Sequence, residues 1–228
     1  MRDDTGGLLA FLRRYDTPTV WNALATLRGR GIEGFTRGPS IVTDPQAPPM
    51  VGYARTAKMV SSDELPMTAA EREAIRYAYY RYVGAGGIVV MQDCGSQPGL
   101  GSIWGEVHAA IHRGLGVLGV ITNGAVRDLD ALGDFPIIAG SICLGNGVTQ
   151  IIEIDTPVEV MGLRVNPGEL IHADRHGAMT IPETYLPALP GAIEALLDKE
   201  RVLIAQTKQP GFDAEALIAI WQEAGAHR

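Results

Sequence analysis

The stretch that most constrains this chain runs from Gly119 to Asp128 and reads GVITNGAVRD. Residues 117–121 form a short apolar run bounded by glycines, which is typical of a buried strand. Gly124 can adopt the φ angles of a sharp turn, so we expect the strand to end there. Arg127 and Asp128 would then begin a helix. Ligands of α/β proteins often bind where strand ends meet helix N-termini, so Arg127 and Asp128 mark a candidate binding site. The alternative is that they form a surface ion pair that only caps the helix.

A second glycine-rich segment, residues 84–87, precedes an apolar run at 88–91. In folds that bind a dinucleotide or S-adenosylmethionine, the glycine turn follows a strand and opens a helix. Here the glycines end a helical segment and lead into a strand. The order of the elements therefore disfavours a methyltransferase.

The rest of the chain alternates between helical and strand patterns. Helices are predicted over residues 5–14, 20–28, 68–83, 103–113, 129–132, 187–206 and 214–224, and strands over 51–60, 88–91, 136–139, 147–154, 158–161, 163–165, 169–173 and 178–181. Thr17 is the expected N-cap of the second helix, and Thr68 with Glu71 has the spacing of a capping box. The sequence thus predicts a single mixed α/β domain whose second half is rich in strands.

Composition narrows the class of protein. A length of 228 residues suits one domain, and a net charge of −7 with no basic run argues against a nucleic-acid partner. Cys94 and Cys143 are isolated, which argues against a disulfide framework or a structural zinc site and favours a reduced, cytoplasmic setting. No apolar run approaches the ~20 residues of a membrane span, and no signal peptide is read at the N-terminus.

The pattern G-x-x-x-x-G-x-x-R-D ends at Asp128 and has Trp104-Gly105-Glu106 upstream of it. Residues 167–177, PGELIHADRHG, follow downstream. Together these motifs resemble the RraA-like family over about residues 15–185. That family includes class II 4-hydroxy-4-methyl-2-oxoglutarate aldolases, related oxaloacetate decarboxylases and a regulator of ribonuclease E activity.

The resemblance implies a single-domain, three-layer swivelling β/β/α fold with additional N- and C-terminal helices, assembled as homotrimers or homohexamers. The whole of residues 1–228 would be one RraA-like domain. The C-terminal helices, within residues 187–224, are expected to pack on a neighbouring subunit rather than on their own domain.

The resemblance also implies the roles of individual residues. Asp128 would be the direct ligand of Mg²⁺ or Mn²⁺, and Glu106 would reach the same cation through water. Arg127 would pair with the keto oxygen and with the enolate that forms from it. Gly105, Val107 and His108 would bind the substrate carboxylate at the N-terminus of a helix, where unpaired amides favour an anion. Glu200, from a neighbouring subunit, is a candidate for a further acid.

The function implied is a divalent-metal-dependent carbon–carbon lyase. It would cleave a 4-hydroxy-2-oxo acid by retro-aldol reaction and release pyruvate, or decarboxylate oxaloacetate, through the same metal-stabilised pyruvate enolate. The alternative is a non-catalytic protein that binds and regulates a ribonuclease. Substrate recognition is expected in the loops at 29–50 and 93–103 and across the subunit interface, and the sequence of none of these regions identifies the substrate.

Three further groups of residues have plainer interpretations. His108 and His112 have the spacing of zinc helices, but no H-E-x-x-H is present, so His112 is expected to pack or to face solvent. Tyrosines 77, 79, 80 and 82 are expected to serve core and subunit packing rather than an aromatic binding stripe. Cys94 matches no catalytic signature and is expected to be a buried thiol.

Overall fold

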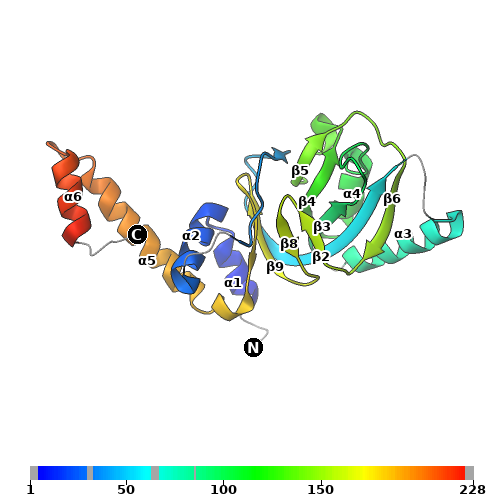
Figure 1. Ribbon diagram of the computed structural model, residues 1–228. Helices are drawn as coiled ribbons and strands as arrows, with labels where there is room; N and C mark the ends of the chain where they lie inside the picture. The colour runs from blue at the N-terminus through cyan, green and yellow to red at the C-terminus, as the bar shows by residue number, and fades with distance from the viewer. Residues whose placement is uncertain (1–4, 30–32, 63–66, 85, 224–228) are drawn as a thin grey trace.

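The computed structural model describes residues 5–29, 33–62, 67–84 and 86–223. Helices lie beside and beyond a curled sheet (Figure 1). They are α1 (Thr5–Leu12), α2 (Thr17–Arg28), α3 (Ala69–Val83), α4 (Glu106–Gly114), α5 (Leu189–Gln206) and α6 (Ala214–Glu223), with 3₁₀ turns η1 (Leu129–Ala131) and η2 (Glu183–Tyr185). The strands are β1 (Ile41–Val42), β2 (Met50–Ser61), β3 (Gly87–Asp93), β4 (Val117–Val126), β5 (Ile137–Ile142), β6 (Thr149–Ile154), β7 (Val158–Val160), β8 (Leu163–Val165), β9 (Leu170–Asp174) and β10 (Gly177–Ile181).

The long strand β2 is the centre of the main sheet. One of its edges pairs in parallel with β3, and β4 and β5 continue in parallel, with β1 antiparallel to β5. The other edge is divided: residues 50–53 pair with β9 and residues 57–61 pair with β6, both antiparallel. β10 completes a hairpin with β9. The order is therefore β1-β5-β4-β3-β2-β9-β10, with β6 beside the second half of β2.

The sheet is covered on both faces because its apolar side chains alternate. Along β3, Val89 and Met91 pack in the cluster that includes α3 and α4. Ile88 and Val90 pack on the other face, in the cluster that includes the β7–β8 hairpin. Helices, main sheet and hairpin thus form three layers, which confirms the predicted β/β/α fold.

The N-terminal helices and the start of α5 form a third cluster against β9, β10 and the first residues of β2. Its buried members include Leu24 of α2, Val51 of β2 and Leu189 and Ile193 of α5. Further along, α5 and α6 extend away from the sheet (Figure 1). Their apolar residues Val202, Ile204, Ile218 and Trp221 are 42–60% exposed. The first turns of α5 therefore pack on their own domain, while packing of the remainder on a neighbouring copy stays a prediction.

The start of α2 differs from the prediction by one residue. Asp16, not Thr17, is the N-cap, because its carboxylate accepts the N–H of Thr19 at 3.0 Å. The Thr17 hydroxyl is instead buried against Nδ1 of His172 at 3.0 Å, and the Thr17 N–H donates to Asp174. The capping box of Thr68 and Glu71 is confirmed. Among the described helices, none is long and apolar enough to cross a membrane.

The prediction that the strand ends at Gly124 is wrong. β4 runs on to Val126, and Gly124 is not among the glycines of positive φ. The backbone of Gly124 is open to other residues, but a Cβ atom there would make tight contacts, 3.3 Å from the Cβ of Asp93 and from Oγ1 of Thr122. The chain turns later, at Asp128, and the predicted helix beyond it is the single 3₁₀ turn η1.

Candidate functional site

The N-terminus of α4 forms one wall of the site. The helix begins at Glu106 rather than near 103, and its N-cap is Gly105, which offers no side chain to the first amides. The first N–H groups of a helix lack intrahelical acceptors, and together they favour a negative group. The Glu106 N–H already points at the carboxylate of Asp128, with N to Oδ2 at 3.3 Å.

The end of β4 lies alongside the residues that lead into α4. Trp104 and Val126 form a parallel bridge, and the Arg127 N–H donates to the Trp104 carbonyl at 2.9 Å. Ser102 fastens both segments: its hydroxyl accepts the Trp104 N–H at 2.8 Å and donates to the carbonyl of Ala125. Because Trp104 takes part in this bridge, α4 begins at Glu106 and not near residue 103 as predicted. The role of Ser102 could not be predicted from the sequence, since nothing local indicates that residues 102 and 125 meet.

Arg127 and Asp128 form an ion pair with Nη1 to Oδ2 at 2.6 Å. The Arg127 Nε donates to the Ser102 carbonyl at 3.4 Å. Both side chains keep a solvent-facing part, with exposed fractions of 25% and 33%. Asp128 has the left-handed conformation, φ 56° and ψ 42°, which is uncommon outside glycine and occurs often at functional sites.

Gly105 is the residue that lets this pair approach the helix. A Cβ atom at that position would collide with Oδ2 of Asp128 and would lie 3.1 Å from Cγ and Cζ of Arg127. Its own φ of −149° is open to any residue. The absence of a side chain, not backbone freedom, is therefore what the site requires of Gly105.

Of the other predicted site residues, Glu106 and Val107 lie beside the Arg127–Asp128 pair, whereas Glu200 lies on a different helix. Glu106 and Val107 are exposed on the first turn of α4, beside the pair. Glu200 lies on α5, and Figure 1 shows that helix extending away from the layer that contains α4. Within one chain the structure therefore does not bring Glu200 to Asp128. Among the described residues, no group of three or more His, Cys, Asp or Glu could hold a metal ion.

His108 and His112 have different environments on α4. His112 is fully buried, with Nδ1 2.7 Å from the His108 carbonyl and Nε2 2.7 Å from the Tyr79 hydroxyl. Since a carbonyl can only accept, Nδ1 carries the proton and Nε2 accepts from Tyr79. Burial lowers the pKa of His112 to about 4. His112 therefore packs in the core, one of the two predicted outcomes.

The imidazole of His108 is half-buried, with Nδ1 3.4 Å from the Tyr80 hydroxyl. Burial, and then the charge of Arg127, lower its pKa. It is accordingly neutral near pH 7 and can accept or donate a hydrogen bond.

The prediction that Cys94 is a buried thiol is wrong. Cys94 directly follows β3 and is exposed on the surface.

The loop after β3 is fixed to β4 by Asn123. Its side chain accepts the Asp93 N–H at 2.7 Å and donates to the Asp93 carbonyl at 3.0 Å. The buried Asp93 carboxylate in turn accepts the N–H groups of Gly95 and Gly99. These contacts set the path of residues 93–101 toward Ser102. Substrate recognition by this loop stays a prediction.

Fold and site together define a three-layer β/β/α protein that presents an arginine, a carboxylate and a helix N-terminus at one point. The sequence model of the RraA-like family, described as Aldolase/RraA, matches residues 17–180. The chain therefore belongs to the RraA-like family, as the motifs around Arg127 and Asp128 indicated.

Two relatives show how far the similarity extends. A protein of Halalkalibacterium halodurans, provisionally named a 4-hydroxy-4-methyl-2-oxoglutarate aldolase, is 30% identical over 140 residues, which are 59% of this chain and 60% of that protein. The protein DlpA of Legionella pneumophila is 27% identical over 111 residues, or 46% of this chain. The chain spans only 18% of DlpA, so the match covers less than two thirds of either relative.

Solved structures share the fold. An uncharacterized protein from Pseudomonas syringae pv. tomato superposes with a TM-score of 0.71 at 21% identity, covering 94% of each chain. Streptomyces coelicolor RraAS2, described as an unusual member of the RNase ES inhibitor RraA protein family, has a TM-score of 0.67 at 20% identity and covers 90% of this chain and 97% of its own. At these identities the similarity establishes the fold alone.

Proposed function

We propose that this protein is a divalent-metal-dependent carbon–carbon lyase acting on a 2-oxo acid. The reaction is retro-aldol cleavage of a 4-hydroxy-2-oxo acid with release of pyruvate, with decarboxylation of oxaloacetate as a companion activity. One observation supports it above the others: Arg127, Asp128 and the first amides of α4 meet at Gly105, where no side chain fits.

The chain's own groups suit the steps of such a reaction. The N–H groups of Val107 and His108 at the start of α4 would hold the substrate carboxylate. The guanidinium of Arg127 would lie by the keto oxygen and oppose the negative charge that develops there as the bond breaks. Asp128 already orients Arg127 in the free protein, so little reorganisation is needed when substrate binds.

The donors at this point fit a hard cation such as Mg²⁺ or Mn²⁺. Asp128 and Glu106 supply only carboxylate oxygens, and Mg²⁺ is commonly bound by one or two carboxylates together with water and substrate oxygens. When bound, the cation supplies Lewis-acid stabilisation of the developing enolate. Asp128 would hold it directly and Glu106 through water. A third acid would come from a neighbouring copy, and Glu200 on the extended α5 is the candidate.

A ring of identical chains would place such an acid at the site. Val107, Leu129 and Leu144 around the site are exposed, and so are Val202 and Trp221 on the extended helices. Two separate apolar surfaces on one chain favour a head-to-tail contact, which closes into a ring such as a trimer. We propose a homotrimer or a homohexamer built on this contact.

The test is an assay of pyruvate release from a panel of 4-hydroxy-2-oxo acids and from oxaloacetate, with and without Mg²⁺ or Mn²⁺. Asp128→Ala should abolish turnover, while Asp130→Ala, an exposed acid two residues away, is the matched control and should retain it. EDTA should inactivate the wild type, and added cation should restore it.

Full turnover in EDTA, or an active Asp128→Ala variant, would contradict the metal mechanism. Saturable binding to a ribonuclease E scaffold segment, with no turnover of any 2-oxo acid, would instead show a regulator of the ribonuclease branch.

A further inference from the structure

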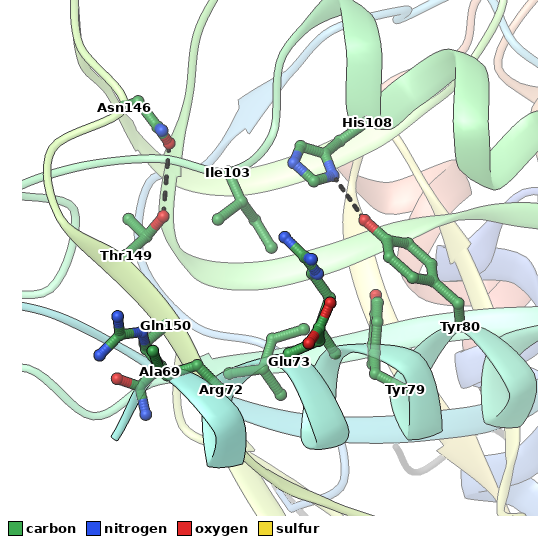
Figure 2. Close-up of a pocket in the computed structure, with 12 residues that line it drawn as sticks. Ala69, Arg72, Glu73, Tyr79, Tyr80, Ile103, His108, Asn146, Thr149 and Gln150 are labelled. Atoms are coloured by element: carbon green, nitrogen blue, oxygen red, sulfur yellow. Dashed lines mark hydrogen bonds between the residues drawn. The ribbon is translucent and has the colours of Figure 1, made fainter. Parts of the chain in front are cut away.

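A polar cavity of about 520 Å³ lies between α3, the first half of α4 and the start of β6. Figure 2 shows its walls: α3 carries Arg72, Glu73 and Tyr80 on one side, and His108 faces Tyr80 from α4. Asn146 and Thr149 stand on a third side and are hydrogen-bonded to each other. Of the residues proposed for the lyase site, His108 lines this cavity, whereas Arg127, Asp128 and Glu106 do not.

The charged groups of the cavity favour an anion. Two arginines of α3, Arg72 and Arg76, line it against one acid, Glu73. Glu73 already accepts the Tyr77 hydroxyl at 2.6 Å. Within the described residues neither arginine forms an ion pair, although Nη1 of Arg72 donates to the Met67 carbonyl at 2.8 Å. At least part of each guanidinium therefore remains available to an acceptor.

Gln150 provides an independent sign that something binds here. It lies on β6, lines the cavity and is only 5% exposed. Its Nε2 and Oε1 atoms are both buried and have no hydrogen-bond partner among the described residues. Buried amides are nearly always paired, because an unpaired one loses its hydration without compensation. A ligand that both donates and accepts a hydrogen bond would satisfy both ends of the Gln150 amide.

We propose that this cavity binds a small organic hydroxycarboxylate, at a site separate from the Arg127–Asp128 pair. The planar guanidinium of arginine matches a carboxylate through two parallel hydrogen bonds. A hydroxyl group on the ligand can donate to Oε1 of Gln150 and accept from Nε2. The volume lies within the range of clefts that hold small ligands. The partly buried His108 and Ile103 border the cavity on the side of α4.

The experiment uses two probes that differ by one hydroxyl group, citrate and tricarballylate. Binding to the full chain is measured by isothermal titration calorimetry in metal-free buffer, because citrate chelates divalent cations. Citrate should bind more tightly than tricarballylate, by about tenfold, the scale of one hydrogen bond. Gln150→Leu should remove most of that preference.

The arginines are tested with a matched control on the same helix. Arg72→Gln and Arg76→Gln should each weaken citrate binding by about tenfold or more, as expected for a charge-assisted hydrogen bond. Arg81→Gln, on α3 but outside the cavity, should leave binding unchanged. Asp128→Ala should also bind citrate normally, so this proposal can fail or hold independently of the lyase.

Three results would overturn the proposal. Equal citrate affinity in the Arg76→Gln and Arg81→Gln proteins would show that the arginines hold no ligand. Loss of citrate binding in Asp128→Ala would make the cavity part of the keto acid site. A change of oligomeric state in Gln150→Leu, measured by sedimentation, with unchanged citrate affinity would show that a neighbouring copy covers Gln150.

Discussion

Lowering the pH should destabilise this protein through His112, before most carboxylates are protonated. The ring is fully buried among Tyr79, Trp104 and Phe135, and both nitrogens are already engaged as a neutral donor and acceptor. Burial lowers its pKa from the usual 6.5 to about 4 in the folded state. Between these values the unfolded chain binds a proton that the folded chain does not, so stability falls as the pH falls.

The magnitude follows from that difference in pKa. Each unit of pKa corresponds to about 1.4 kcal/mol, so the full loss from His112 is on the order of 3 kcal/mol. The loss begins as the pH drops through about 6.5 and is complete near 4. His172 is also buried with a lowered pKa and adds to the same trend. Such a loss is a large part of the 5–15 kcal/mol that typically stabilises a folded domain.

The assay is urea denaturation followed by far-ultraviolet circular dichroism, at fixed protein concentration, at several pH values from about 8 to 5. Wild type is compared with His112→Gln, which can still donate and accept but does not titrate. Because the substitution itself changes the free energy of unfolding, the slope of that free energy against pH is the quantity compared. The variant should have a clearly shallower slope, and His108 and His172, whose pKa values are also lowered, account for the remainder. Equal slopes in the two proteins would refute the assignment to His112.

Three further predictions concern the site. Arg127→Lys keeps the positive charge but loses the planar guanidinium, so kcat for pyruvate release should fall about 10²-fold with little change in KM. A large rise in KM at unchanged kcat would instead show that Arg127 only binds the substrate carboxylate. Gly105→Ala should lower kcat with only a small change in melting temperature, because its φ is ordinary and the added methyl group strikes Asp128; an unimpaired kcat would contradict the close approach. Ser102→Ala removes two buried hydrogen bonds and should lower the free energy of unfolding by about 1–3 kcal/mol. A change below ~0.5 kcal/mol would show that these hydrogen bonds do not hold β4 against the segment that leads into α4.

Much of the fold could be predicted because its signals are local. The capping box at Thr68, the alternation along β2 and the turn between β9 and β10 each depend on a few neighbouring residues. The Arg127–Asp128 motif was also recognisable, and the structure brings it to the helix start that contains Gly105.

What the sequence did not reveal depends on contacts between distant residues. The strand continues through Gly124 because Ala125 and Val126 pair with β5, opposite Ser141 and Ile142. The helix starts late because Trp104 bridges to Val126. The cavity assembles Arg72 of α3, His108 of α4 and Gln150 of β6, and no periodic pattern relates these three positions.

The divided edge of β2 has a consequence for synthesis of the chain. β2, β3, β4 and β5 leave the ribosome in the order in which they pair, so one side of the sheet can assemble as it emerges. The partner of the first half of β2 arrives much later, since Met50 pairs with Ala173. Until then an apolar strand keeps an open edge, which is where misassembly and aggregation begin. A nascent chain of this protein is therefore most vulnerable before β9 is made, and slowing translation over residues 100–170 should increase its need for chaperones.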